Sequence, residues 1–392
     1  MSRSLEIIRI LSLVALAAAT VSLLSGCGDR GDDESDDPDA VVGGGDKTGD
    51  GDTEESEIVE DADTSDDASR LKIFGKAKAD AWKFSADVPG GEQLGDSVAA
   101  VALPGRMALF TGGYLGTHAT KTAYLYSGAT NSWRQVSDMH VARNQHRMVR
   151  LNDGRVLVLG GDDGESLLDS AELYDPNTEQ FTLAPSMKRA RNFFIVELLL
   201  DGRVLIAGGD PDQQTFHLSA EVYNPTANEF TSIGMIDGDP RASARLPDGR
   251  VLMVGSGIFT TAYLFNPNTN QFSPTAGNLH SVHGYFPTAT ALPDGRVLVA
   301  GGYSGDPNAS DRTDLYDPNT GMFTEGPHMS VARQSHVAML MPNGTVMLLG
   351  GVDNGDVRDS GDLFDPADDT MTAMTQHMSA QRSNFAGVAL IP

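Results

Sequence analysis

The chain has 392 residues, 40% of them hydrophobic and 21% charged, with 43 glycines, 19 prolines and a single cysteine. This length can hold one large domain, and a lone cysteine excludes an internal disulfide framework. The formal net charge of −26 makes nucleic acid and anionic lipid surfaces poor partners.

The first 27 residues have the anatomy of an export signal. Arg3 and Arg9 flank the start of an apolar run over residues 10–24, which is too short to span a bilayer comfortably and ends in small residues. The sequence Leu24-Ser25-Gly26-Cys27 resembles the lipobox of bacterial lipoproteins, and this resemblance implies that Cys27 is lipidated and becomes the mature N-terminus. The alternative is an ordinary signal peptide with an incidental cysteine, which would leave a free thiol in an oxidising compartment.

Lipidation would anchor the protein in a bacterial cell envelope, with the lipid as its only contact with the membrane. Gly28 follows the cysteine, at the position where an aspartate retains some lipoproteins in the inner membrane. The resemblance therefore favours the outer membrane, on its periplasmic or its outer side.

Residues 28–69 are expected to form an acidic, disordered tether. Between residues 29 and 67 there are 18 Asp or Glu against Arg30 and Lys47, a local charge of −16. A segment of this composition cannot bury enough apolar surface to offset its ordering entropy. The total of −26 less −16 leaves −10 for the rest of the chain, so the overall acidity says little about the surface of the folded domain.

From residue 95 onward the sequence repeats itself with a period of 46 to 49 residues. The marker is a glycine pair, of which one copy is reduced to Gly255-Ser256. The repeat glycines are Gly112, Gly113, Gly160, Gly161, Gly208, Gly209, Gly255, Gly301, Gly302, Gly350 and Gly351. Such a period indicates a solenoid, a propeller or an array.

Each repeat is predicted to form four short strands, named a to d in chain order. In the second repeat, residues 143–151 form strand a, 155–159 form b, 170–174 form c, and d begins near Phe181. The a–b turn is Asp-Gly or Asn-Gly in five repeats, a pair typical of a type I′ hairpin. A proline follows Asp or Asn in the c–d turns, where its fixed φ angle starts a turn.

The fold class predicted for residues 70–392 is all-β, a ring of four-stranded blades, because the strands are short and evenly spaced. The glycine pair with an aromatic residue in strand c and another in strand d resembles the kelch motif, as in Gly160-Gly161, Tyr174 and Phe181. The resemblance implies a kelch-type β-propeller of the kind that forms the central domain of galactose oxidase. Packing between blades is the expected role of these aromatic residues.

Seven blades are predicted, with six as the alternative. Six repeats are complete, and residues 71–74 and 82–84 look like an additional c and d. Residues 382–390 look like an additional a. Kelch propellers close by letting the C-terminal strand complete the first blade, which implies a seventh, split blade whose strand b would come from residues 55–60.

Ligand binding is expected on the face that carries the b–c and d–a loops, near the mouth of the central channel. These loops vary between repeats, and variable loops on a rigid scaffold usually carry binding residues. The candidate ligand-binding residues are His140, Arg143, His146, Asp163, Arg191, Arg241, His280, His283, His328, Arg333, His336 and Arg382. Substitutions such as His283→Ala and Arg333→Ala are expected to weaken binding and leave stability nearly intact. The alternative interpretation is that the histidines mark a recurring structural position and that the arginines pair with acids.

No catalytic residue, metal site or cofactor is predicted. Acidic residues in the same loops could bind Ca²⁺, but no repeat shows the spacing of a known calcium loop. The copper chemistry of galactose oxidase needs a cysteine-linked tyrosine, and the only cysteine is Cys27 in the lipobox. Some kelch-type enzymes act on sialic acids through channel Arg and acidic residues, and both types are present here.

Three functions therefore remain open. The first is a monomeric binding protein whose partner is a protein or a glycan, and it is preferred because catalytic signatures are absent. The second is an enzyme that acts on sugars or sugar acids at the channel mouth. The third is a structural component of the envelope.

Overall fold

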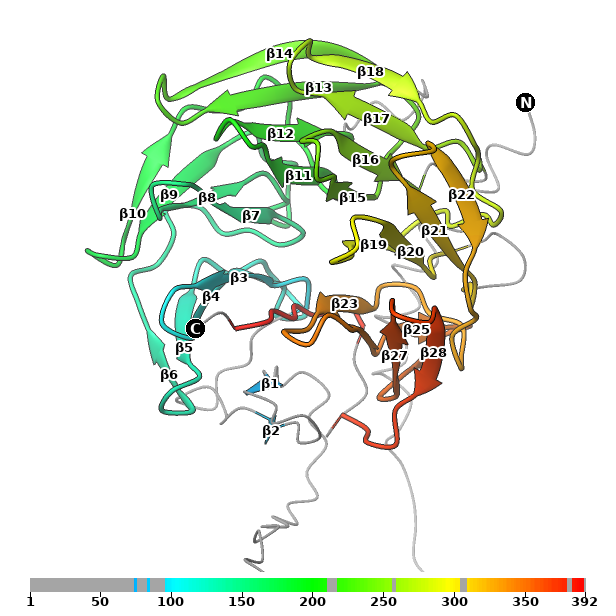
Figure 1. The fold of residues 1–392 in the computed structure, drawn as a ribbon. Coiled ribbons are helices and arrows are strands. Elements are labelled where there is room, and N and C mark those ends of the chain that lie inside the picture. The colour runs from blue at the N-terminus through cyan, green and yellow to red at the C-terminus, as the bar shows by residue number, and fades with distance from the viewer. Residues whose placement is uncertain are drawn as a thin grey trace, which may run out of the picture. The chain divides into compact units, whose positions relative to one another are not determined.

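The computed structural model describes residues 74–75, 83–84, 96–209, 217–255, 259–303, 309–378 and 383–390. They all belong to the second of two compact units, which covers residues 67–392. Six four-stranded antiparallel sheets, here numbered blades 1 to 6, are arranged in a ring around a common centre (Figure 1).

Strand a of each blade is innermost and strand d is outermost. Blade 1 comprises β3 (Ala99–Leu103), β4 (Met107–Thr111), β5 (Ala123–Ser127) and β6 (Ser132–Gln135); blade 2, β7 (Arg147–Arg150), β8 (Val156–Leu159), β9 (Ala171–Asp175) and β10 (Gln180–Ala184); blade 3, β11 (Ile195–Leu198), β12 (Val204–Ala207), β13 (His217–Asn224) and β14 (Glu229–Asp237). Blade 4 comprises β15 (Ala242–Arg245), β16 (Val251–Val254), β17 (Tyr263–Asn266) and β18 (Gln271–Pro274); blade 5, β19 (Thr288–Ala291), β20 (Val297–Ala300), β21 (Thr313–Asp317) and β22 (Met322–Glu325); blade 6, β23 (Val337–Leu340), β24 (Val346–Leu349), β27 (Gly361–Asp365) and β28 (Thr370–Ala373). Two short pairs lie outside these sheets, β1 (Phe74–Gly75) with β2 (Lys83–Phe84) and β25 (Val352–Asp353) with β26 (Asp356–Val357).

The b strands explain why the apolar runs do not alternate with polar residues. All four residues of β8, β12, β16, β20 and β24 are buried. Each b strand lies inside its sheet and is covered by a neighbouring blade on either face, so both sets of its side chains enter a core. The four-stranded kelch-type blade predicted from the repeat is confirmed.

The a–b turns differ from the predicted type I′ hairpin. In blade 2, the amide of Gly154 donates to the carbonyl of Leu151, and the amide of Leu151 donates to the carbonyl of Arg155. Only Gly154, at φ +91°, has a positive φ, whereas Asp153 does not. The loop is therefore a three-residue type I turn closed by a glycine in the left-handed region, and Asp153 instead accepts hydrogen bonds from Arg155.

The strand c and strand d aromatic residues lie directly opposite each other. Tyr174 pairs with Phe181 at a ring-centroid distance of 4.9 Å, and Tyr223 pairs with Phe230 at 4.7 Å. Facing aromatic residues of this kind stabilise neighbouring antiparallel strands. The pattern that marks the repeat is thus a packing feature of the outer half of each blade.

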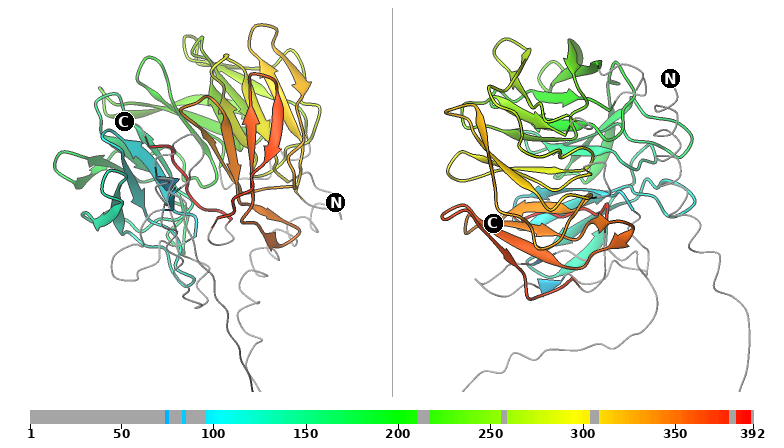
Figure 2. Two further views of the ribbon diagram at one scale, coloured as in Figure 1. Left: turned by 60° about the horizontal axis from the view of Figure 1, so that its bottom comes forward. Right: turned by 90° about the vertical axis from the view of Figure 1, so that its right-hand side faces the viewer.

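The core is divided into clusters that lie between blades. Five of them join consecutive blades from 1 to 6. The remaining two both include the C-terminal segment, residues 383–390: Phe385 packs against blade 6, and Phe385, Val388 and Leu390 pack against blade 1. This segment therefore fills the gap between the last blade and the first, where the ribbon views place it (Figures 1 and 2).

Six complete blades are present in the described part of the chain, which is the alternative number, and the preferred count of seven is corrected. The predicted additional c and d correspond to β1 and β2, which pair only with each other among the described residues. The C-terminal segment takes the place of the predicted additional a but joins no sheet there. The predicted b at residues 55–60 lies outside the described residues, and so do Cys27 and the segment 28–69.

The repeat glycines allow the blades to approach closely. The amide of Gly161 in blade 2 donates to the carbonyl of Arg191, which precedes blade 3, at 2.7 Å. A Cβ atom on Gly161, which has φ +91°, would lie only 2.4 Å from the carbonyl oxygen of Asn144. A side chain at this position would push the loop away from the b strand, so the glycine is required by close packing.

Candidate functional site

The inner strands enclose a cavity of about 480 Å³ at the end of the channel where the d–a loops enter strand a. It is lined by the beginning of every a strand and by residues 384–387 of the C-terminal segment. This is the face on which ligand binding was expected, and the volume suits a small molecule or the end of a chain.

A ring of non-glycine residues with positive φ surrounds this cavity. They occupy the same position two residues before strand a or its equivalent: Ser97, Gln145, Phe193, Phe286, Ser335 and Asn384, with φ between +50° and +60°. Their backbones link successive blades, since the amide of Asn384 donates to the carbonyl of Ser335 and the amide of Ser97 donates to that of Asn384. Such sparsely populated conformations cluster at functional sites.

Two arginines form the cationic part of the cavity wall. Arg147 donates from Nε to the carbonyl of Phe194 at 2.9 Å, and enclosure by protein, followed by the charge of Arg241, lowers the pKa of Arg147. Arg241 donates to Asp239 and, at 3.3 Å, to the carbonyl of Phe193, and its guanidinium lies 5.1 Å from the ring centroid of Tyr285. Two arginine side chains on the same wall of the cavity favour an anionic group on the ligand.

Glu197 is the carboxylate of the same wall. Burial raises its pKa, although a hydrogen bond from the Ser243 hydroxyl at 2.9 Å and the charge of Arg245 act in the opposite direction.

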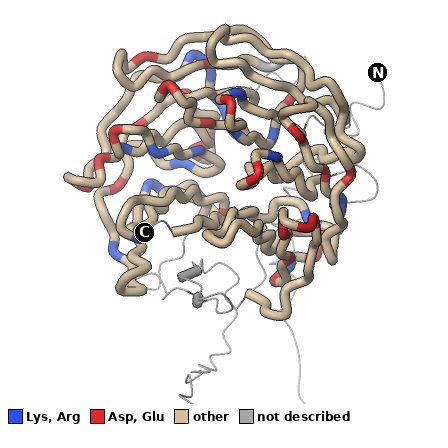
Figure 3. The backbone as a smooth tube through the Cα atoms, in the orientation of Figure 1, with Lys and Arg blue, Asp and Glu red and all other residues tan. Residues whose placement is uncertain are grey.

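The two sides of the cavity differ in their side chains. Phe193 and Phe286 meet edge to face with their ring centroids 5.5 Å apart. At the equivalent position on the opposite side stand Ser97, Ser335 and Asn384. The charged groups and the Phe193–Phe286 pair therefore come from blades 2 to 5, whereas the opposite side carries these small side chains and Phe385, which packs against blades 1 and 6. Over the described part of the propeller, by contrast, basic and acidic residues are interspersed along the backbone (Figure 3).

His146 and His336 also line the cavity but are themselves buried. Burial, together with nearby charges that include Arg143 and Arg333 respectively, lowers the pKa of each histidine to about 3. Each shares a hydrogen bond with a threonine of the preceding blade, His146 with Thr111 and His336 with Thr288. They are neutral over the physiological range.

Three of the candidate arginines are enclosed within the blades. Arg143, Arg191 and Arg333 have no exposed surface, and each donates to the carbonyl of the first repeat glycine of its blade and to a buried acid of strand c. The acids are Glu172, Glu221 and Asp362, at 3.0, 2.8 and 2.9 Å. Burial lowers the pKa of Arg143, although its contacts with Glu172 oppose this. We correct the expectation for Arg333→Ala, because these side chains face a buried partner and not a ligand.

His283 takes the arginine position in blade 5 and is equally buried. Its two ring nitrogens lie 2.7 Å from the carbonyl oxygen of Gly301 and 2.9 Å from Asp314 of strand c. In blade 4 both members of the pair are absent, because Gly238 and Tyr263 stand at these positions. The expectation that His283→Ala would leave stability intact is corrected for the same reason.

The remaining candidates lie on the loops, outside the lining of the cavity. His140 and His280 are half-exposed and bond to Glu172 and Asp314. His328 bonds to Asp311, and Asp163 accepts the amides of Glu165 and Ser166, which hold its pKa below the ordinary value. Arg382 lies outside the described residues. The structure therefore brings Arg241, His146 and His336 to the cavity, and it separates the other candidates from it.

Sequence reasoning missed Arg147, Glu197, Phe193 and Phe286, because they fall at the start of segments that were assigned to strand a. A signal was present. At the position of Phe193 and Phe286 the other blades and the C-terminal segment carry Ser, Gln, Asn or, in blade 4, Pro240. A departure from the repeat of this kind marks a position that packing does not require to be aromatic.

Within the described ranges no group of three or more His, Cys, Asp or Glu side chains converges to hold a metal ion. No helix in that part of the chain is long and apolar enough to cross a membrane. We therefore assign no Ca²⁺ site and no other cofactor site to the described residues.

The comparisons with known proteins agree with the fold. The kelch motif model matches residues 149–188. A fungal alcohol oxidase of the AA5 family, solved in complex with copper, is similar over 77% of this chain and 68% of its own, with 16% identity and a TM-score of 0.62. YjhT is similar over 74% of this chain and 99% of its own, with 13% identity and a TM-score of 0.56. No curated protein sequence matches the chain. Together with the blades, these similarities show a β-propeller fold that contains a kelch motif.

Proposed function

We propose that the protein is a lipid-anchored component of a bacterial envelope whose propeller binds a glycan at the loop-bearing mouth of its channel. The observation that carries the proposal is the asymmetric cavity, in which Arg147, Arg241 and the Phe193–Phe286 pair lie on one side and uncharged residues lie on the other. Aromatic rings cover the apolar faces of sugars, and guanidinium groups bind anionic substituents. A glycan that carries an anionic group fits this set better than a flat protein surface does.

The cellular setting is part of the same proposal. Lipidation of Cys27 would attach the protein to the outer membrane, and the acidic segment 28–69 would hold the propeller away from it. The protein would act as a monomer, without nucleic acid, and would touch the membrane only through its lipid. A protein partner would instead contact the rim formed by the b–c and d–a loops.

A glycan array probed with the full chain carrying Cys27→Ser tests the ligand class. We expect anionic glycans to bind and neutral ones to bind weakly or not at all. Arg147→Gln removes a cation of the cavity and should weaken binding at least tenfold, since a hydrogen bond to a charged group contributes about 1.5 to 3 kcal/mol. Asn177→Ala and Asn319→Ala, in c–d turns on the opposite face, are the matched controls. Equal losses for all three variants would contradict the proposal.

An enzyme that acts on sugars or sugar acids is the second candidate, and Glu197 is the observation that favours it. A carboxyl group with a raised pKa can serve as a general acid. NMR spectra of a bound glycan incubated with the protein would show product formation. Under this alternative Glu197→Gln abolishes turnover and retains binding, whereas an unchanged glycan spectrum supports the binding protein.

A further inference from the structure

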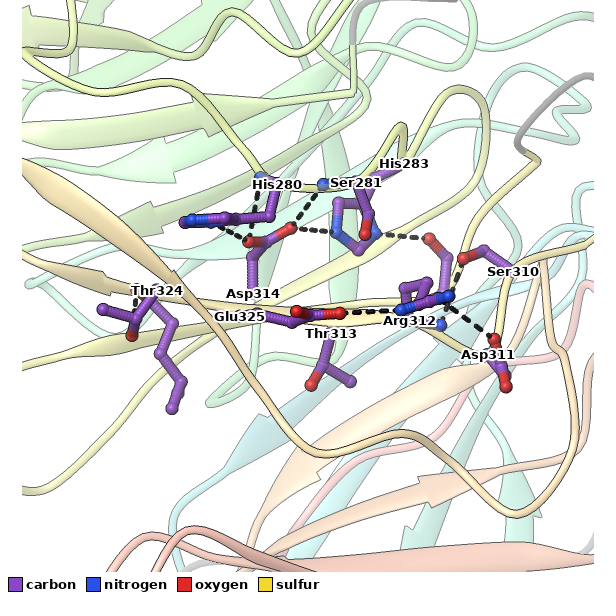
Figure 4. A network of polar contacts seen from close by, with 12 residues as sticks. His280, Ser281, His283, Ser310, Asp311, Arg312, Thr313, Asp314, Thr324 and Glu325 are labelled. Atoms are coloured by element: carbon purple, nitrogen blue, oxygen red, sulfur yellow. Dashed lines mark hydrogen bonds and ion pairs between the residues drawn. The ribbon is translucent and has the colours of Figure 1, made fainter.

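Blade 5 contains a buried histidine where blades 2, 3 and 6 contain a buried arginine. His283 contacts the carbonyl oxygen of Gly301 and the carboxylate of Asp314, the counterparts of the groups that the arginines contact (Figure 4). A guanidinium stays charged at every physiological pH, whereas histidine side chains titrate between about pH 5 and 8. Blade 5 is thus the only complete blade in the described residues that carries a histidine at this position.

The contacts place a proton between His283 and Asp314. A carbonyl oxygen only accepts hydrogen bonds, so Nδ1 must donate to Gly301 at 2.7 Å. Asp314 also accepts the amides of His280 at 3.0 Å and Ser281 at 3.2 Å. With Nδ1 protonated, the 2.9 Å contact between Nε2 and the Asp314 carboxyl oxygen needs a further proton, and we assign it to Nε2, which gives an imidazolium beside a carboxylate.

The loop held by His283 forms part of the cavity wall. Tyr285 lies beneath the guanidinium of Arg241, and Phe286 packs edge to face on Phe193. The carbonyl of Phe286 also accepts the amide of Ser335 in the ring around the cavity. Release of His283 would therefore free the aromatic side of the site.

We propose that blade 5 makes the channel site pH-dependent, with protonated His283 holding residues 280–287 in place and loss of its proton loosening them. The effect on ligand affinity rests on the proposed function; the loosening of the loop does not. The sign follows from the hydrogen bonds: without the second proton one of the two acceptors loses its donor, so the order is present at mildly acidic pH and lost as pH rises.

The neighbouring charged groups leave His283 as the group to test. Of those facing it, His336 has a pKa of about 3 and does not titrate in this window, and Arg333 keeps its charge. His280 also contacts Asp314. Blade 2 supplies the matched comparison, because His140 binds Glu172 in the same way above a permanent cation, Arg143.

Hydrogen exchange on the full chain tests the proposal, with His283→Arg as the variant. Blade 6 shows that an arginine and an aspartate fit this pair of positions. After correction for intrinsic exchange, protection of residues 280–288 in the unaltered protein should fall between pH 6 and 8.5 by up to about tenfold per pH unit, the limit for one proton. Residues 140–147 should show no such fall, and His283→Arg should flatten the response of 280–288. The same pH trend in both proteins would overturn the proposal.

Two further measurements keep the result interpretable. Nitrogen-15 spectra of the unaltered protein should show His283 with both ring nitrogens protonated at pH 6, and a neutral ring would overturn the proposal even if His283→Arg fails to fold. Sodium glucuronate is the ligand probe, expected to bind more weakly at pH 8 than at pH 6, and less so in His283→Arg. Absence of glucuronate binding at every pH would count against the proposed function. The hydrogen-exchange result would still test whether residues 280–287 loosen as pH rises.

Discussion

Replacing Arg191 by Met should destabilise the propeller far more than an arginine substitution at the surface does. Arg191 is fully buried and donates four hydrogen bonds: to the carbonyl oxygen of Gly208 at 2.7 Å, to the carbonyl of Ser219 at 3.0 Å, to the Ser219 hydroxyl at 2.8 Å and to Glu221 at 2.8 Å. Met fills part of the volume but donates none of these bonds.

The expected cost is about 3 to 5 kcal/mol, the range for breaking a buried ion pair from one side. Glu221 would keep its bonds from the amides of Lys188 and Arg189, but it would remain buried without a cation. The double substitution Arg191→Met with Glu221→Leu should recover most of the loss, because an apolar pair often replaces a buried ion pair at little cost. Blade 4, with Gly238 and Tyr263 at these positions, shows that a blade forms without the pair.

Urea unfolding at pH 7 measures these differences as shifts of the midpoint. At a slope of about 3 kcal/mol per molar, Arg191→Met should lower the midpoint by about 1 M or more. Arg155→Met is the control, since Arg155 is partly exposed and donates to Asp153 of its own turn, a pair worth about 0 to 1 kcal/mol. Equal midpoints for Arg191→Met and Arg155→Met would refute the assignment of the buried arginines as internal anchors of the blades.

Two further predictions concern the packing between blades, and a third concerns the lipid anchor. Truncation after residue 378 removes Phe385, Val388 and Leu390 from the gap between blades 6 and 1. The melting temperature should therefore fall, and the protein should self-associate in size-exclusion chromatography. An unchanged melting temperature and a single monomer peak would contradict this prediction. Gly161→Val should lower the free energy of unfolding in urea by more than about 4 kcal/mol, because its Cβ would meet a carbonyl oxygen. Gly154→Val should lower it by only about 1 to 2 kcal/mol, for the positive φ, since nothing lies within 4 Å of its Cβ. Similar losses for the two variants would argue against close contact between blades. Cys27→Ser should move the protein from the membrane fraction to the soluble fraction, and its retention in high salt would disprove the lipid anchor.

The architecture could be predicted because the same pattern of strands and turns recurs in each repeat. The glycine pairs, the turn glycines such as Gly154 and the aromatic pairs such as Tyr174 with Phe181 all recur, and recurrence separates structural positions from accidents. The blade number was harder, since closure depends on which distant segments meet. Residues 383–390 pack in the gap without joining a four-stranded sheet there, and a sequence pattern does not distinguish these two outcomes.

The candidate cavity lies on the face where binding was expected, but it is lined by mostly different residues. The arginines were candidates for ligand binding, with pairing to acids as the alternative. Arg143, Arg191 and Arg333 turn inward to acids on strand c, a pairing set by the fold and not by neighbours in sequence. The residues that do face the cavity depart from the repeat without carrying a known motif. Phe193 and Phe286 could have been found by aligning the repeats and asking where an aromatic replaces a small polar residue.

The most direct test of the central claim is a crystal structure of the protein soaked with an anionic glycan identified on the array. The account predicts ligand density in the channel cavity, with the anionic group between Arg147 and Arg241 and a sugar face against Phe286. Density in the turns of the opposite face, near Asn177 or Asn319, with the cavity empty, would contradict it.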